Sequence, residues 1–303
     1  MLLSDKRSGS TILQEEICKH PLIQHVDYTP HTYFETHHWL KAARVLNVPK
    51  EEYLYQKKYR GYGSRRSAKL YMIDCIRGNV PQFTIPADDE ELVFEGWNAL
   101  CSRFAQPVFF EKSPQYLAQW STLSLILRWI ESTDYEVRFI GLVRNPMSVL
   151  YSARERFFTS PYSRQFVWAQ TYRNLLAMKE IVGNHRFHLV RYEDLIEEPS
   201  RSFREICRFL GLDYCKEMGR SVHTRSAKKW RDDPEFTIRL HPHVVGVGRY
   251  FGYTDEDVFN PDKPGMSVVN SMRWHIKKFY KLKKARFFDR VVKPATMNVF
   301  GRK

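Results

Sequence analysis

The sequence predicts a single α/β domain with a central, mostly parallel sheet flanked by helices. Two short runs of branched and aromatic residues, 107–111 and 137–143, are typical of buried parallel strands, and a turn and a helical pattern follow each run. Residues 186–195 form a third unit of this strand-to-turn type. The 303 residues suffice for one large α/β domain. We expect it to cover 1–270, with a basic helical tail at 271–303.

The other elements follow from apolar periodicity and from helix stop signals. In chain order, the patterns predict a short strand at 1–4, a helix at 10–19, a candidate second strand at 32–35, and helices at 89–104 and at 200–210. Ligands of parallel sheets bind beyond the carboxyl ends of the strands. The functional residues are therefore expected directly after each strand.

The segment after the first strand consists of Lys6, Arg7, Ser8, Gly9, Ser10 and Thr11. A glycine-containing turn that enters a helix points backbone N–H groups at an anion, and an arginine fork matches phosphate oxygens. A helix cap beside a surface Lys-Arg pair is the alternative, and the residues leave both open. Mg-nucleotide loops continue from glycine into Lys and Ser or Thr, whereas Ser10 follows Gly9 here. The loop therefore suits a phosphate group without a tightly bound Mg²⁺. We expect the domain to be P-loop-like.

A second candidate anion site follows the strand at 137–143. Arg144 stands at the end of that strand, and Ser152 lies two turns along the next helix. An arginine and a serine in these places can hold one phosphate from two sides. A surface arginine and an ordinary helical serine are the alternative. The two candidate anion sites together make a stronger case for a phosphate-bearing ligand than either site does alone.

These segments resemble the sulfotransferases that use 3′-phosphoadenosine 5′-phosphosulfate (PAPS), and most of all the carbohydrate- and heparan-directed members. The resemblance runs in order from about Lys6 to Tyr253. It rests on the segments "RSGSTIL", "FEKSPQYL", "LVRNPMSVLYS", "VRYEDLIEEPSRSFREICRFLGL" and "HTRSAKKWRDD…GRYFGY". The resemblance implies that the first loop cradles the 5′-phosphosulfate, that Arg144 and Ser152 bind the 3′-phosphate, and that no metal takes part.

The resemblance also assigns catalytic roles. Glu35 is the expected general base, with His37 as the second choice, and Lys112 is expected to contact the sulfuryl group or the acceptor. A strand-end carboxylate bonded to the backbone or paired with an arginine is the alternative for Glu35, and a surface ion pair with Glu111 is the alternative for Lys112. The residues expected to line the adenine pocket are Tyr192, Thr224 and Arg225, although Tyr192 can equally be an aromatic packed beside the sheet.

The predicted function is transfer of a sulfuryl group from PAPS to a hydroxyl or amine of a glycan. The net charge of +14 favours polyanionic ligands in general, and no motif indicates a specific nucleic acid. The rival functions are a small-molecule or tyrosine sulfotransferase, a P-loop nucleotide kinase, and a non-catalytic binder of polyanions. The kinase is disfavoured because Lys-Ser or Lys-Thr does not follow Gly9.

The tail at 271–303 is strongly basic, with Asp289 its only acidic residue. It is expected either to lie on an anionic membrane or glycan, or to form a solvated helix with one packed face. The cysteines show no metal-type spacing. The sequence lacks a signal peptide and a membrane span, which predicts a cytoplasmic location, or the Golgi lumen if an N-terminal anchor is missing.

Overall fold

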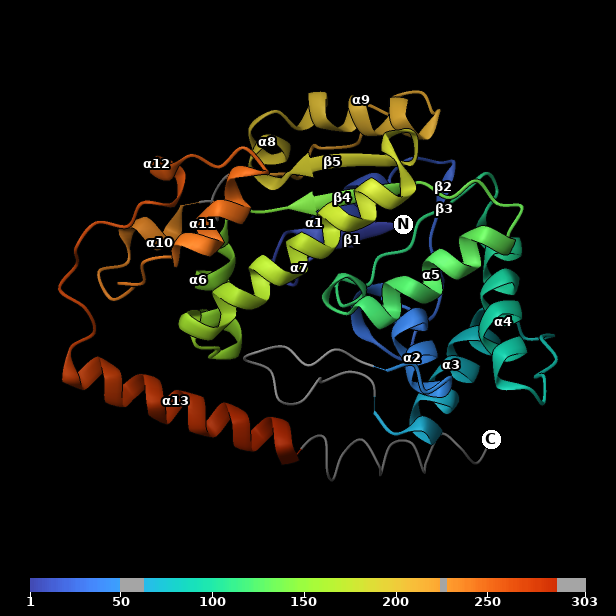
Figure 1. Ribbon diagram of the computed structural model, residues 1–303, viewed down its shortest axis with the longest axis horizontal. Coiled ribbons are helices and arrows are strands. Elements are labelled where there is room, and N and C mark those ends of the chain that lie inside the picture. The colour runs from blue at the N-terminus through green and yellow to red at the C-terminus, as the bar shows by residue number, and fades with distance from the viewer. Residues whose placement is uncertain (50–62, 224–227, 288–303) are drawn as a thin grey trace.

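The computed structural model describes residues 1–49, 63–223 and 228–287. Its centre is a parallel sheet in the order β1-β4-β5, built from Leu2–Ser4, Phe139–Val143 and Phe187–Arg191. Leu2 pairs with Ile140, and Phe139 pairs with Phe187. This sheet, flanked by helices, confirms the predicted fold class (Figure 1).

Alternate strand residues point to opposite faces of the sheet, as the two-residue period of a strand requires. One face buries residues such as Leu2, Ile140 and Val190 beneath α1 (Ser10–Ile17), α8 (Tyr192–Glu197) and α9 (Pro199–Leu210). The other face, with residues such as Leu3 and Phe139, packs on α6 (Pro146–Phe157), α7 (Pro161–Val182) and α11 (Pro242–Arg249). Figure 1 shows α7 crossing the sheet, with α8 and α9 beyond β5.

A layer of helices extends the core on the Leu3 and Phe139 face away from the sheet. Its members are α2 (His38–Val45), α3 (Arg65–Asn79), α4 (Asp89–Phe104) and α5 (Trp120–Ser132). The other described elements are β2 (Ile23–Gln24), β3 (Val108–Phe109), α10 (Lys229–Asp232), α12 (Asp255–Val258), α13 (Val268–Phe287), η1 (Thr32–Phe34), η2 (Tyr116–Ala118) and η3 (Asn184–Arg186). No helix within the described ranges is long and apolar enough to cross a membrane.

Most of the predicted elements occur. The helix predicted at 89–104 has those bounds, and the helix predicted at 200–210 ends before Gly211, which has a φ of 72°. The run at 107–111 contributes only β3, which pairs with β2 in a separate parallel ribbon. Lys112, just beyond that run, forms an isolated parallel bridge with Leu2 and so lies beside the main sheet.

The candidate strand at 32–35 is wrong. This segment forms the 3₁₀ helix η1, in which Tyr33 and Phe34 have φ values of 65° and 53°. Such left-handed backbone cannot join an extended ladder, and the side chains of Tyr33 and Phe34 are exposed. The aromatic content suggested a strand, but the backbone turns sharply here and brings Glu35 into the protein.

Candidate active site

The loop after β1 ends in Gly9, which is the N-cap residue of α1. Gly9 has a φ of 93°, and no side chain accepts a hydrogen bond from the first turn of this helix. A Cβ atom at this position would lie 2.2 Å from Cε2 of the Tyr192 ring. The first amide groups of α1 thus have no side-chain acceptor and can serve an anion. This geometry favours the phosphate cradle over a cap by Ser10 or Thr11.

Two side chains of α7 hold the loop from inside the protein. The hydroxyl groups of Ser8 and Tyr172 lie 2.8 Å apart, and Tyr172 donates to the carbonyl of Leu142 at 3.1 Å. Arg164 Nη2 donates to the carboxylate of Asp5 at 2.5 Å, and both side chains are buried. The Ser8 hydroxyl therefore fastens the loop to α7, whereas Lys6 is exposed.

The loop and the end of β4 meet through direct contacts of their arginines. Arg7 Nε donates to Ser152 Oγ at 2.9 Å, and Arg144 Nη1 donates to the carbonyl of Arg7 at 3.0 Å. The Arg144 guanidinium lies 4.3 Å from the centre of the Tyr192 ring. Burial lowers the pKa of Arg7, and the nearby charges of Arg144 and Arg156 lower it further. This concentration of positive charge suits a polyanion.

The position of Arg144 is fixed by its surroundings. Trp168 Nε1 donates to the Arg144 carbonyl at 3.1 Å, and the side chain of Asn145 caps α6. The backbone N–H of Asn145 donates to the Glu193 carboxylate at 3.1 Å, and the Tyr253 hydroxyl donates to the same carboxylate at 2.7 Å. Burial raises the pKa of Glu193, despite these hydrogen bonds. The ends of β4 and β5 are therefore tied together directly behind Arg144.

Glu35, Lys112 and His37 form a cluster beside β1. Lys112 Nζ donates to Glu35 Oε1 at 2.9 Å, and the Lys112 side chain is fully buried. The other oxygen, Oε2, accepts a hydrogen bond from His37 Nε2 at 3.0 Å. The backbone of Lys112 bridges to Leu2, so the cluster adjoins the strand that leads into the Gly9 loop.

The alternative interpretation of Lys112, a surface ion pair with Glu111, is wrong. Both side chains are buried, and the Lys112 ammonium pairs with Glu35 instead. Glu111 Oε1 accepts hydrogen bonds from Thr36 at 2.8 Å and from Ser113 at 2.6 Å. Burial raises the pKa of Glu111. Glu111 thus braces the segment that carries Glu35, because Thr36 follows Glu35 directly.

The pKa values in the cluster are strongly shifted. Burial by itself raises the pKa of Glu35, but the His37 hydrogen bond and the Lys112 charge outweigh burial and lower the pKa to about 2. Burial lowers the pKa of His37 to about 4, against the opposing effect of Glu35. The carboxylate is thus ionised and the imidazole neutral near pH 7. Perturbed groups of this kind cluster at functional sites.

Tyr33 lies between this cluster and the arginines. Its ring centre is 5.9 Å from Lys112 Nζ, and its phenol partly offsets the lowered pKa of Arg7.

The structure therefore gathers most of the predicted site residues at the carboxyl ends of β1 and β4. Thr224 and Arg225 lie outside the described residues. Sequence reasoning missed Tyr172, Arg164 and Glu193, which support the site from behind and carry no motif.

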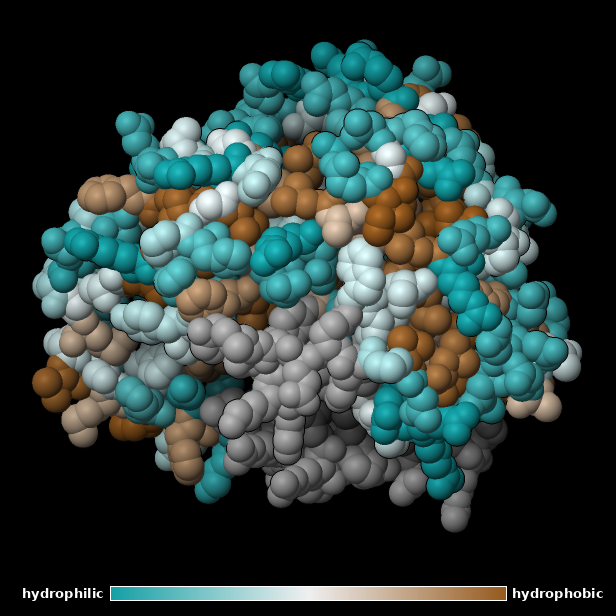
Figure 2. Space-filling view, in the orientation of Figure 1, coloured by the Kyte–Doolittle hydropathy of each residue, from teal (hydrophilic) through white to brown (hydrophobic). Residues whose placement is uncertain are grey.

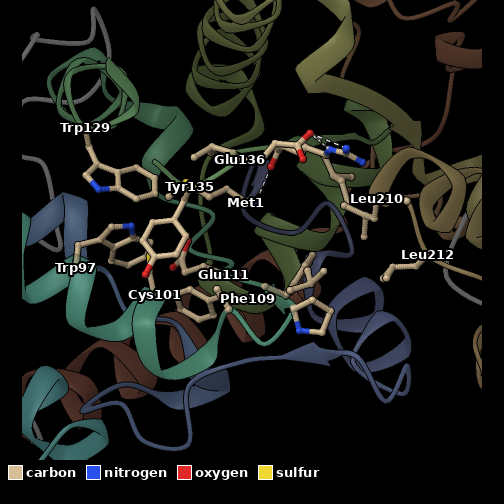
Figure 3. A pocket seen from close by; sticks show the side chains of 18 residues that line it. Met1, Trp97, Cys101, Phe109, Glu111, Trp129, Tyr135, Glu136, Leu210 and Leu212 are labelled. Carbon is tan, nitrogen blue, oxygen red and sulfur yellow. Dashed lines mark hydrogen bonds and ion pairs between the residues drawn. The ribbon is translucent and has the colours of Figure 1, made fainter. Parts of the chain in front are cut away.

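A cavity of about 430 Å³ lies at the opposite ends of the strands, where Met1 and Ile140 contribute to its wall. Figure 3 shows the aromatic side chains of Trp97, Trp129 and Tyr135 facing Leu210 and Leu212 across it. Because Met1 precedes β1 and Ile140 lies near the start of β4, this cavity is remote from Gly9 and Arg144. Glu111, whose carboxylate braces the segment that carries Glu35, also lines this cavity.

The family model described as "Sulfotransferase family" matches residues 1–216, which include the Gly9 loop, Glu35, Lys112 and Arg144. The chain belongs to the sulfotransferase family. The match covers both candidate anion-binding loops and the buried Glu35-Lys112 pair, so it coincides with the part of the fold that builds the candidate site.

Curated relatives include the omega-hydroxy-beta-dihydromenaquinone-9 sulfotransferases Stf3 of Mycobacterium bovis and Mycobacterium tuberculosis. Each is 26% identical over 160 residues, a match that covers 47% of this chain and 41% of the relative. The chain thus spans about two fifths of the length of these relatives.

Among solved structures, the sulfotransferase domain of the Synechococcus PCC 7002 olefin synthase has a TM-score of 0.59 at 22% identity, over 84% of this chain and 94% of that domain. The sulfotransferase domain from the curacin biosynthetic pathway has a TM-score of 0.58 at 20% identity, over 84% and 96%. At these identities, the two structures establish the fold.

Proposed function

We propose that the protein transfers a sulfuryl group from PAPS to a hydroxyl or amine, with Glu35 as the general base. The observation that carries this proposal is the buried pair of Glu35 and Lys112, which adjoins the strand that leads into the Gly9 loop. One site thus combines a proton acceptor with a concentration of positive charge. Family membership supports the reaction class.

The residues present fit the nucleotide. The amides of α1 and the Arg7 guanidinium would hold the 5′-phosphosulfate, together with Gly9, Ser10 and Thr11. Arg144 and Ser152 would hold the 3′-phosphate, and Tyr192, Thr224 and Arg225 the adenine. When bound, PAPS supplies the sulfuryl group and a phosphate leaving group. Cationic side chains and N–H groups at that phosphate stabilise the charge that develops on it.

The proton of the attacking hydroxyl or amine would pass to the Glu35 carboxylate. Lys112 holds Oε1 at 2.9 Å and His37 holds Oε2 at 3.0 Å, so the carboxylate has a fixed orientation. A change of partner by the Lys112 ammonium would remove one of the causes that lower the pKa of Glu35 and make the carboxylate more basic. A well-placed base contributes about 10²- to 10⁴-fold in rate.

The acceptor class is the finer part of the proposal. The motif resemblance predicts a glycan, whereas the mycobacterial relatives are named for a hydroxylated menaquinone.

Helix α13 offers an observation of its own. Six of its apolar side chains are between 54% and 77% exposed, namely Val268, Val269, Met272, Ile276, Phe279 and Tyr280. Figure 2 shows apolar and polar side chains side by side at the lower left, where Figure 1 places α13.

Helix α13 also carries basic residues and is attached close to the active site. Its lysines include Lys277, Lys278 and Lys281. Lys281 Nζ donates to the carbonyl of Arg156 at 2.9 Å, and the Trp274 ring lies 5.4 Å from the Phe158 ring. These contacts are at the end of α6, the helix that bears Ser152. We therefore propose that α13 lies on an anionic membrane and presents the site to an amphiphilic, hydroxyl-bearing acceptor.

The triple variant Met272→Ser, Ile276→Ser, Phe279→Ser should bind anionic phospholipid vesicles at least about tenfold more weakly than the wild type, because large apolar side chains that contribute about 1.5–3 kcal/mol each on full burial are lost. Vesicle sedimentation at low salt measures this. The matched control, Ile181→Ser, removes an apolar side chain that is 56% exposed on α7 and keeps wild-type binding. Equal binding by the wild type and the triple variant would refute the membrane contact. Faster turnover of soluble oligosaccharides than of lipid-linked acceptors would favour the glycan.

Activity with PAPS should persist in excess EDTA, and ATP with Mg²⁺ should not be a donor. Phosphoryl transfer relies on bound Mg²⁺ to neutralise charge on the transferred group, and Gly9 is followed by Ser10 instead of the lysine of a Mg-nucleotide loop. Transfer of labelled sulfate or phosphate measures both reactions. Loss of activity on chelation that Mg²⁺ restores, or turnover of ATP, would contradict the proposed function and favour the kinase.

A further inference from the structure

Three potential metal ligands gather around one oxygen of Glu35. His31 Nδ1 lies 3.6 Å from Glu35 Oε2, and His37 Nε2 lies 3.0 Å from the same oxygen. Ligand atoms of His31, Glu35 and His37 all lie within 4.8 Å of one another. A tetrahedral Zn²⁺ with bonds of about 2.0–2.1 Å separates its ligand atoms by about 3.3 Å. The triangle therefore needs only small side-chain movements to enclose an ion.

The backbone of η1 brings these side chains together. In an extended strand, His31 and His37 would be separated by about 20 Å at 3.3 Å per residue. Instead Tyr33, Phe34 and His37 have positive φ values of 65°, 53° and 50°, and the chain folds back on itself. Backbone of this kind costs about 1–3 kcal/mol per residue and tends to occur at functional sites.

The surroundings decide which cation the triangle would take. Two imidazoles and one carboxylate suit zinc and neighbouring transition metals, whereas Mg²⁺ prefers sites made of oxygen atoms. The Lys112 ammonium, 2.9 Å from Oε1, opposes any cation, so only ions with strong imidazole bonds would compete. His31 is exposed and gives access from solvent, whereas Glu35 and His37 are buried. Three protein ligands would leave a fourth position for water.

We propose that His31, Glu35 and His37 form a Zn²⁺-binding site, and that bound Zn²⁺ inhibits the protein by occupying Oε2 of Glu35. The inhibition rests on the proposed function, whereas metal binding does not. The ion replaces the hydrogen bond between His37 and Glu35, and the imidazole proton takes the Nδ1 position of its ring. Zinc thus acts as a regulator of the proposed transfer reaction.

Co²⁺ serves as the spectroscopic probe, because bound Co²⁺ in a tetrahedral site absorbs visible light. We expect a stoichiometric absorption band with the wild-type chain that added Zn²⁺ abolishes and that excess Mg²⁺ leaves unchanged. His31→Gln should weaken Zn²⁺ binding at least about tenfold. Even groups that only hydrogen-bond to a metal ligand contribute about 10- to 100-fold to metal affinity. His243→Gln, an exposed histidine on α11, is the matched control and should bind Zn²⁺ as the wild type does.

Transfer assays complete the test. The wild type and His243→Gln should lose activity in Zn²⁺ and regain it in EDTA, whereas His31→Gln, measured against its own rate without metal, should resist at least about tenfold more Zn²⁺. Absence of the Co²⁺ band, or equal Zn²⁺ inhibition of all three proteins, would overturn the site. Full activity with Zn²⁺ bound would overturn the inhibition. A Co²⁺ band that needs His31, in a protein without any PAPS-dependent transfer, would support the metal site and refute the proposed function.

Discussion

Glu35→Gln should lower the rate of sulfuryl transfer by about 10²- to 10⁴-fold, the usual contribution of a general base. The substitution keeps the size of the side chain and leaves an amide oxygen for the Lys112 ammonium, but it removes the proton acceptor. Binding of 3′-phosphoadenosine 5′-phosphate should stay close to wild type, because the nucleotide is expected to contact Arg7 and Arg144. Single-turnover kinetics and calorimetric titration measure the two quantities.

His37→Gln is the comparison that distinguishes the two candidate bases. His37 donates to Glu35 Oε2 at 3.0 Å, so its loss should disturb the orientation of the carboxylate and cost less than the loss of Glu35 itself. Near wild-type turnover by Glu35→Gln, with a severe loss in His37→Gln, would make His37 the base. Retained nucleotide binding would show that each variant is folded. This check is necessary because the Lys112 ammonium is buried, and disturbing its ionic partner can destabilise the fold.

Arg144→Ala should weaken the binding of 3′-phosphoadenosine 5′-phosphate by about 10- to 100-fold, since a charge-assisted contact contributes about 1.5–3 kcal/mol. The analogue without the 3′-phosphate should lose much less. Calorimetric titration of both ligands provides the comparison. Arg156→Ala removes a nearby charge from an exposed position and is the matched control, with a smaller loss expected. Equal losses of both ligands in Arg144→Ala would place Arg144 away from the 3′-phosphate.

The positions of the candidate anion-binding residues were predictable because the carboxyl ends of parallel strands converge on one edge of a sheet. Arg7 and Arg144 each follow a strand, and the structure joins them through a 3.0 Å hydrogen bond. Local patterns also predicted α4, because apolar residues recur at helical spacing over 89–104, and the structure adds Asp88 as its N-cap. In both cases the determining signal is contained in a short stretch of sequence.

The supports of the site were not predictable in this way. Tyr172 and Arg164 reach the Gly9 loop from α7, and which face of a long helix meets which loop depends on tertiary packing. The segment around Glu35 was expected to be a strand, but its left-handed residues turn the chain, and Glu35 pairs with the buried Lys112. The same turn created the cluster of His31 and His37, whose spacing matches no common metal motif.

The contact between Gly9 and Tyr192 couples two positions far apart in the sequence. Any residue larger than glycine at position 9 would collide with the Tyr192 ring, and a smaller residue at position 192 would remove the surface on which Arg144 lies. We therefore expect a change at either position to damage the candidate nucleotide site unless the other position changes with it.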